Sequence, residues 1–424
     1  MVKKATRLLC VACVCSISCE GGGPVEVVSD DQFLQQQSAT IWPFSIEVPE
    51  ADLVDLQKRL ERARYPDELN GVGWAYGTPR AYMEELVAYW RDEFDWREQE
   101  RQLNRFNQFK TNIDGLDIHF IHQRSVHSEA LPVLIVHGWP SSFMQFHKVI
   151  NPLVNPENYG GVPGDAFHLV VPSIPGYGFS DQPKKPGYAA AEMGDIFIEL
   201  MSRLGYDKYG VQAGDWGAPI VAHIARNNSV QVVGMHTETC RGGPPVGVAD
   251  PTEGVPVFEL ERMRDRQAFF SDEEQGYRAI QGSKPQTLAY ALNDSPLGQA
   301  AWIVEKYRAW SDTSGDLESK FSKDELLTNI SIYWFTQTSN SSGRLYFEGN
   351  RRNSINPPSQ HVRIEVPTGC AAYPKDVGFT PRLWNEAIYN VTRFTILPRG
   401  GHFAALEEPE LYVNEVRAFF GELR

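Results

Sequence analysis

The chain has 424 residues, which is long enough for two or three ordinary domains or for one enlarged fold. Its 40 Lys and Arg residues against 54 Asp and Glu residues give a net charge of −14, so its field repels polyanions and disfavours nucleic-acid binding. A hydrophobic content of 42% with 22% charged residues is typical of globular proteins. Disorder, collagen and coiled coil are excluded as the main architecture.

The beginning of the chain predicts an export signal. Basic residues precede an apolar run over 8–17, which is shorter than the roughly 20 residues that a bilayer crossing needs. Small residues and Cys19 follow, in a context that resembles a bacterial lipoprotein signal without its usual leading Leu. We therefore expect residues 1–19 to be a leader, either cleaved or lipidated at Cys19. The protein would then be periplasmic or membrane-anchored in a bacterium, and otherwise secreted.

Only two of the six cysteines, Cys240 and Cys370, lie outside the leader. A disulfide framework is therefore excluded, whereas the sequence leaves a single bridge between these two open. Their spacing from histidines does not match a zinc site, so we expect no metal.

The next segments predict a tether followed by an N-terminal extension. Residues 20–41 are rich in Gly, Ser, Gln and Asp without periodicity, which indicates a flexible tether. The extension, 42–130, contains an amphipathic helix from about Pro49 to Arg64 and a helical region from about 79 to 105. It ends in two short apolar runs around Asp114-Gly115, which predict a hairpin.

The remainder predicts an α/β fold whose mostly parallel sheet is flanked by helices. Continuous apolar runs separated by helical stretches indicate strands that are buried on both faces; they lie at 131–136, 167–171, 209–212, 232–235, 361–366 and 391–397. The first core part would be 131–240 and the second 357–424, closed by a helix that begins at Pro409. The segment between them, 241–356, breaks the alternation and is helical and aromatic, so we expect it to form a lid.

The segment around Asp215 predicts a nucleophile. It reads Val211-Gln212-Ala213-Gly214-Asp215-Trp216-Gly217, in which a strand meets small residues, a central reactive side chain and the start of a helix. This layout is typical of the nucleophile elbow of α/β-hydrolases. A carboxylate at the centre suits displacement at saturated carbon, which gives an ester that must then be hydrolysed.

A histidine and an acid follow Asp215 in the order that this fold requires. His402 lies behind two glycines, after the last predicted strand and before the final helix. Asp376 lies in a loop 26 residues earlier and would orient the imidazole. Glu365 is a weaker candidate for the acid because it lies within a predicted strand. A Gly-X-Ser-X-Gly elbow is missing, which disfavours a serine esterase.

Two backbone N–H groups are candidates for an oxyanion hole. His137-Gly138-Trp139-Pro140 directly follows a predicted strand. The loop at this position in the fold supplies one N–H group, and the residue after the nucleophile supplies the other. These residues would be Trp139 and Trp216.

These segments together resemble the microsomal-type epoxide hydrolases of the α/β-hydrolase superfamily. The resemblance covers the chain from about Trp42 to its end and rests on five motifs: HGWP from His137, PGYGFS from Pro175, GDWG from Gly214, ALNDSP from Ala291 and RGGHFAALEEPE from Arg399. The sequence departs from the family pattern at Ser141 and Ala213, where Gly is frequent, and at Asp376, where the mammalian enzymes have Glu.

The resemblance implies two proton donors in the lid, Tyr277 and Tyr346, and the hydrolysis of an epoxide to a vicinal diol through an ester on Asp215. The implied partners are a small apolar epoxide and water, without a metal or organic cofactor and without nucleic acid. The tether would allow membrane attachment through Cys19, and the sequence does not define an oligomeric state. Two alternatives remain at this point: a dehalogenase acting on haloalkanes or haloacids with the same Asp215, His402 and Asp376, and a catalytically silent binding protein.

Overall fold

The computed structural model describes residues 40–355 and 362–424. The predicted leader with Cys19 lies outside the described residues, as does almost all of the predicted tether. Within the described ranges, we find no helix whose length and apolar character would allow it to cross a bilayer.

One sheet of nine strands, counted over the described residues, runs through the molecule in the order β1-β2-β3-β5-β4-β6-β7-β8-β9. The strands from β5 to β9 in this order pair in parallel, whereas β1, β2 and β3 form an antiparallel edge. Their bounds are β1 Ile41–Phe44, β2 Gln108–Ile113, β3 Leu116–Gln123, β4 Leu131–Val136, β5 Phe167–Pro172, β6 Tyr209–Ala213, β7 Val232–Thr237, β8 Ile364–Ala372 and β9 Tyr389–Ile396. The mostly parallel α/β fold predicted from the sequence is confirmed.

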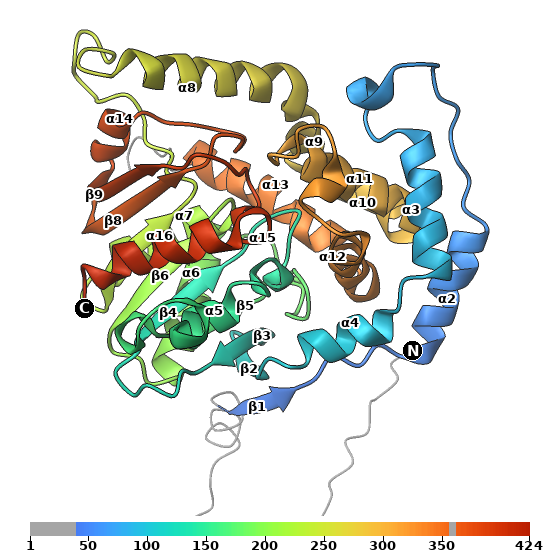
Figure 1. Cartoon of the computed structure of the whole chain (residues 1–424), viewed down its shortest axis with the longest axis horizontal. Coiled ribbons are helices and arrows are strands. Elements are labelled where there is room, and N and C mark those ends of the chain that lie inside the picture. The colour runs from blue at the N-terminus through green and yellow to red at the C-terminus, as the bar shows by residue number, and fades with distance from the viewer. Residues whose placement is uncertain (1–39, 356–361) are drawn as a thin grey trace, which may run out of the picture.

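Both faces of the parallel strands are covered by helices, as their continuous apolar sequences require. In β4, Val133 and Ile135 pack into one buried cluster with residues of the helices α5 (Ile150–Val154) and α16 (Pro409–Gly421). Leu134 and Val136 point to the other face, into a larger cluster with α6 (Ala190–Arg203) and α7 (Gly217–Asn227). Figure 1 shows these helices on either side of the sheet.

The lid occupies the space between the sheet and the N-terminal helices (Figure 1). Its helices are α8 Val257–Phe269, α9 Gln275–Gln281, α10 Pro285–Asp294, α11 Pro296–Ala309, α12 Lys323–Thr336 and α13 Ser339–Ile355. A turn of π-helix over Phe270–Glu274 joins α8 to α9. The chain leaves the core after β7 and returns to it at β8, so the lid is an insertion in the sheet.

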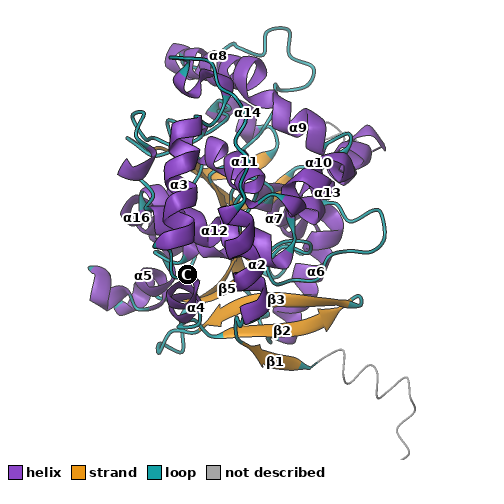
Figure 2. Ribbon diagram, turned by 90° about the vertical axis from the view of Figure 1, so that its right-hand side faces the viewer, coloured by secondary structure: helices purple, strands orange, loops and turns teal. Residues whose placement is uncertain are grey.

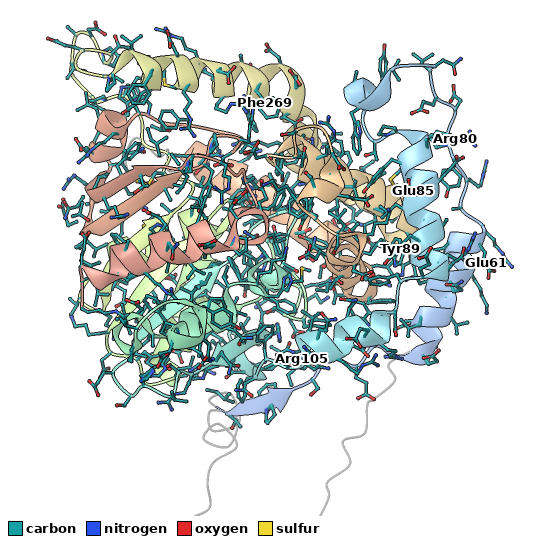
Figure 3. All side chains as sticks on the ribbon, in the orientation of Figure 1. Glu61, Arg80, Glu85, Tyr89, Arg105 and Phe269 are labelled. Carbon is teal, nitrogen blue, oxygen red and sulfur yellow. A yellow bond between two sulfur atoms is a disulfide. The ribbon has the colours of Figure 1, made fainter. Side chains whose placement is uncertain are left out.

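The N-terminal extension packs against this lid. Its helices are α2 Glu50–Glu61, α3 Arg80–Asp92 and α4 Trp96–Leu103, and Figure 2 shows α2 and α3 in front of the lid helices. Glu85 and Tyr89 lie on α3 (Figure 3). The Tyr89 hydroxyl donates to Asp324 at 3.0 Å, and the Lys323 ammonium lies 2.8 Å from Glu85. The extension therefore contacts the beginning of α12 through these polar side chains.

Several element boundaries differ from the predictions. The helical region predicted over 79–105 is broken between α3 and α4, because the Asp95 side chain accepts the Glu98 N–H group at 3.1 Å and begins a new helix. β1 was not predicted. β8 begins at Ile364 and extends to Ala372, six residues beyond its predicted end. The hairpin is confirmed: β2 pairs with β3 around Asp114 and Gly115, which both have positive φ.

A disulfide joins Cys240 and Cys370, whose Cα atoms are 5.7 Å apart. Cys240 follows β7, where the chain leaves the core, and Cys370 lies in β8, where it returns. The bridge left open by the sequence is therefore present at the base of the lid.

Candidate active site

Asp215 lies on a strained turn between β6 and α7. Its φ of +47° is in the left-handed region that residues other than glycine rarely adopt. Gly138 makes room for the turn, since a Cβ atom there would lie 2.4 Å from the Asp215 Cβ atom. The Asp215 N–H group donates to Thr239 Oγ at 3.0 Å, which anchors the turn to the end of β7. The carboxylate is thus presented at the carboxyl edge of the sheet, as an α/β-hydrolase nucleophile requires.

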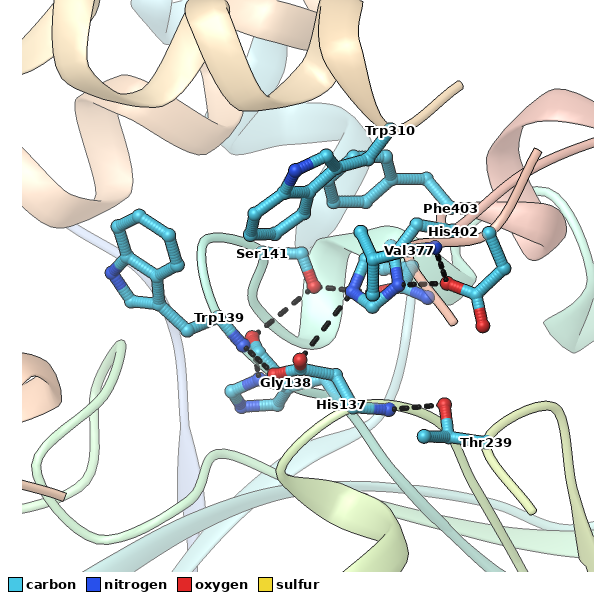
Figure 4. Close-up of polar contacts among 12 residues, drawn as sticks. His137, Gly138, Trp139, Ser141, Thr239, Trp310, Val377, His402 and Phe403 are labelled. Carbon is cyan, nitrogen blue, oxygen red and sulfur yellow. Dashed lines mark hydrogen bonds and ion pairs between the residues drawn. The ribbon is translucent and has the colours of Figure 1, made fainter. Parts of the chain in front are cut away.

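Backbone N–H groups hold one side of the Asp215 carboxylate. The Trp139 N–H donates to Oδ1 at 2.8 Å, and the Trp216 N–H also donates to this carboxylate. Both N–H groups predicted for the oxyanion hole therefore contact the same side chain. Figure 4 shows Trp139 and His402 in this region. Oδ1 is thus bound by the Trp139 N–H group, whereas Oδ2 lies 3.5 Å from His402 Nε2.

His402 lies between the two predicted carboxylates. Its Nδ1 atom is 2.6 Å from Asp376 Oδ1, and its Nε2 atom is 3.5 Å from Asp215 Oδ2. Asp376 Oδ1 also accepts the Val377 N–H group at 2.7 Å, which fixes the carboxylate (Figure 4). Glu365, the weaker candidate for the acid, is exposed on β8 and pairs with Arg363 instead. The structure thus brings Asp376, not Glu365, to the imidazole.

The charges around His402 favour its protonated form. Desolvation lowers the pKa of the imidazole, but Asp376 and Asp215 outweigh it and raise this pKa to about 10. For Asp215, burial raises the pKa, whereas His402 and the two N–H groups lower it below its ordinary value overall. At neutral pH the site therefore favours an imidazolium beside an ionised Asp215. The Asp215 carboxylate is available without a prior proton transfer.

Tyr277 on α9 and Tyr346 on α13 lie in the lid, near Asp215. Both are buried, and their rings meet edge to face with centroids 5.6 Å apart. Tyr277 stacks on Trp139 at 4.9 Å with an interplanar angle of 5°, and Tyr346 packs edge-on against Trp216 at 4.9 Å. Burial raises the pKa of each phenol, and the Asp215 charge raises it further. Both hydroxyls therefore keep their protons at neutral pH and can donate them.

Trp310, at the end of α11, was not identified from the sequence as part of the site. Its carbonyl oxygen accepts the His402 N–H group at 2.8 Å, and its ring packs edge-on against the imidazole at 5.0 Å. Gly401 allows this approach, because a Cβ atom there would lie 2.3 Å from the Trp310 carbonyl oxygen. The second glycine of the RGGH motif thus fits the lid against the histidine loop.

Glu238 is a second group that the sequence reading missed. It follows β7 directly, and its carboxylate accepts from the Gln212 amide at 3.1 Å. Burial and the nearby Asp376 charge raise the pKa of this carboxyl group to about 7. Its position at the carboxyl end of a strand beside β6 could have identified Glu238 from the sequence, because functional groups of this fold gather at that edge of the sheet.

The cavity beside the nucleophile is small. It measures about 10 Å³, close to the space of one water molecule. Besides Asp215 and His402 it is lined by Gly138, Trp139, Ser141, Gln145, Gly214 and Phe403. Within the described residues, no group of three or more His, Cys, Asp or Glu side chains is arranged to hold a metal ion.

The chain matches two family models. Residues 41–146 match the model described as the epoxide hydrolase N terminus, and residues 132–240 match the α/β-hydrolase fold. Epoxide hydrolase 1 of Sus scrofa is 38% identical over 411 residues, which cover 91% of this chain and 90% of that protein.

Solved structures of epoxide hydrolases are also similar to this chain. The crystal structure of juvenile hormone epoxide hydrolase from Bombyx mori aligns with a TM-score of 0.85 and 33% identity, covering 93% of this chain and 97% of that one. The epoxide hydrolase of Aspergillus niger aligns with a TM-score of 0.81 and 29% identity, covering 92% of this chain and 98% of that one. Relatives of this similarity and coverage favour epoxide hydrolysis over the dehalogenase and the silent binding protein.

Proposed function

Because the chain belongs to the epoxide hydrolases of the α/β-hydrolase fold, we propose that it opens the epoxide ring through a covalent ester on Asp215. The observation that carries this proposal is the environment of the Asp215 carboxylate. One oxygen is held by the Trp139 N–H at 2.8 Å, and the other faces the His402 imidazole at 3.5 Å. A carboxylate bound in this way can attack with Oδ2 while Oδ1 becomes the carbonyl oxygen of the ester.

In the first step, Asp215 Oδ2 forms a bond to one ring carbon and the bond from that carbon to the epoxide oxygen breaks. The electron pair goes to the oxygen, which would leave as an alkoxide, a poor leaving group without an acid. Tyr277 and Tyr346 are the proton donors, since both are buried, protonated and on the lid side of the nucleophile. One phenol gives up its proton and the other stabilises the oxygen with a hydrogen bond.

In the second step, His402 first loses its own proton to solvent, because the ester has removed the Asp215 charge that stabilised the imidazolium. It then removes a proton from water, and the hydroxide adds to the ester carbonyl carbon of Asp215. The negative charge then forms on Oδ1, where the N–H groups of Trp139 and Trp216 receive it; one such donor is typically worth about 3 kcal/mol. Collapse of this intermediate breaks the bond between the carbonyl carbon and Oδ2. The departing oxygen takes the proton of the added hydroxyl, so the diol is released and Asp215 is again a carboxylate. The proton taken up by His402 returns the phenol to its neutral form, so the sum is epoxide plus water to diol.

A single turnover in ¹⁸O-labelled water tests the covalent route. The oxygen delivered to the first diol comes from the Asp215 carboxylate, so this diol should be unlabelled and the label should appear in the peptide that contains Asp215. Asp215→Asn should lower turnover by at least about 1,000-fold, since an amide is a far weaker nucleophile. Glu365→Gln, which changes an exposed carboxylate outside the site, is the matched control. Labelled diol from the first turnover would refute the ester.

The substrate proposed for this site is an apolar epoxide. The lid contributes aromatic side chains above Asp215, among them Trp310 and the two tyrosines, and such surfaces recognise apolar groups. The Bombyx mori relative is named for juvenile hormone, which makes extended epoxides suitable first compounds for a screen. We also propose that the protein is exported. The Cys240–Cys370 bridge supports export, because such bonds persist in oxidising compartments.

A further inference from the structure

A buried ion pair lies behind Tyr277, outside the groups used in the mechanism above. The Lys306 ammonium on α11 is 2.7 Å from Glu274 Oε2, and both side chains are less than one-tenth exposed. Charges in such a position are costly to bury unless they are paired and hydrogen-bonded. A hydrophobic pair of similar size would fill this part of the lid equally well. The buried charges are therefore expected to have a role other than filling space.

Glu274 also fixes Trp310. The same oxygen, Oε2, accepts the Trp310 indole N–H at 2.7 Å. Glu274 is the last residue of the π-helical turn, three residues before Tyr277, and a π-helical turn within a helix is frequent at functional sites. One carboxylate oxygen therefore ties the helix that carries Tyr277 to the helix that carries Lys306 and Trp310.

These contacts enclose the Tyr277 ring. Trp139 stacks on it at 4.9 Å, Trp310 packs against it at 5.1 Å, and the Lys306 ammonium lies 5.1 Å from its centroid. A cation over the face of a phenol ring is attracted by the ring and helps to hold it in place. The ion pair thus controls the place of the Tyr277 ring.

We propose that Glu274 and Lys306 are positioning residues for ring opening, which act by holding Tyr277 as the proton donor to the epoxide oxygen. His402 depends less on them, because its ring is fixed by Asp376 at 2.6 Å; its N–H group is bound by the Trp310 carbonyl, whereas Glu274 contacts Trp310 through the indole N–H. The pair therefore affects formation of the Asp215 ester more than hydrolysis of this ester. The inference rests on the proposed ester mechanism.

Rapid-quench single turnovers with a radiolabelled styrene oxide test the inference, because protein-bound label measures ester formation and ester decay separately. Glu274→Gln should slow ester formation by at least about tenfold, a part of the effect that general acids typically supply, and should change ester decay by less than about threefold. Lys306→Met should slow ester formation in the same way, since it keeps the length of the side chain and removes its charge. Lys306→Arg keeps the charge and should retain most of the wild-type rate of ester formation.

Glu305→Gln is the matched control. Glu305 also contacts the Lys306 ammonium, at 2.6 Å, but it belongs to α11 itself and does not link that helix to Tyr277. This variant should keep both rates within about threefold of the wild type. If Glu274→Gln fails to fold, the comparison of Lys306→Met with Lys306→Arg decides the question.

Equal losses in both steps, an unchanged rate of ester formation, or an arginine variant no faster than the methionine variant would overturn the inference. Absence of protein-bound label in the wild type would instead refute the ester mechanism itself. The two failures are therefore distinguishable.

Discussion

In the proposed mechanism, His402 faces opposite demands in the two steps. In the free protein it lies between Asp376 and Asp215, and these two charges raise its pKa to about 10 against the effect of desolvation. A protonated imidazole cannot accept a proton from water. Esterification neutralises Asp215, however, and removes one of the two charges that hold the proton. The imidazole pKa must therefore fall when the ester forms, which makes the histidine a base only when a base is needed.

This coupling predicts a pH dependence that belongs to one step. The rate of ester decay should rise with pH and level off once His402 has lost its proton, with a midpoint clearly below 10, since only Asp376 still stabilises the cation. Ester formation should not show this rise, because Asp215 is ionised throughout the neutral range. Single-turnover rates from pH 5 to 10 give the midpoint of decay, and NMR of ring-labelled histidine gives the pKa in the free protein.

His402→Gln provides the control for this measurement. The ester should still form in this variant and then persist without a pH-dependent decay. A decay midpoint equal to the pKa of the free protein would contradict the coupling through Asp215.

Some residues of the site can be identified from local sequence motifs, whereas others can be identified only from contacts in the folded protein. Asp215, Trp139 and His402 lie in short motifs at strand ends, so the sequence alone predicted that they would meet, and the structure brings them together. Trp310, Glu274 and the other groups that hold them are defined by contacts between helices distant in the chain. A tryptophan at a helix end can serve many structural roles. Only its observed packing against His402 identifies Trp310 as part of the site. The assigned chemical roles remain predictions for the experiments above.

At the scale of elements, the strands with continuous apolar sequences were predicted closely, because burial on both faces leaves a strong local pattern. β1 left no such pattern. Its four residues, Ile41–Phe44, include a proline, and the segment is a strand only because β2 supplies its hydrogen-bond partners. Because this pairing depends on a segment that is distant in the chain, the local sequence of β1 does not predict it.

The extension and the lid form one packed unit, and a substitution of Trp90 on α3 tests whether they unfold together. The side chain is 3% exposed and belongs to the same buried cluster as lid residues such as Leu326 and Leu327. Trp90→Ala should lower the free energy of unfolding by about 3 to 5 kcal/mol through lost burial and the cavity left behind. Because the extension, lid and sheet share this cluster, urea unfolding followed by circular dichroism should still give a single transition.

Tyr76→Ala is the control on the same extension, since that side chain is 78% exposed. It should change the free energy of unfolding by no more than about 0.5 kcal/mol. Two separate transitions in the Trp90 variant would indicate that the extension folds independently of the lid.

At the scale of the whole molecule, one covalent bond closes the lid onto the core. Cys240 and Cys370 are 130 residues apart in sequence, and the loop between them contains every lid helix from α8 to α13. Cys240 comes two residues after Glu238 and directly after Thr239, whose hydroxyl anchors the Asp215 turn. The bridge therefore fixes the point at which the insertion leaves the sheet, close to the nucleophile.

Removal of this bridge should destabilise the protein chiefly through the unfolded chain. Replacing both cysteines with serine frees a loop of 130 residues, and the resulting gain in chain entropy should lower the free energy of unfolding by about 2 to 5 kcal/mol. Guanidinium unfolding of the wild type and of the double serine variant, each with and without reductant, measures the difference. The wild type should lose stability on reduction, whereas the variant should be insensitive to the reductant. Protein recovered after export should contain no titratable thiol from Cys240 or Cys370, and free thiols in the exported protein would contradict both the stabilising role of the bridge and the proposed compartment.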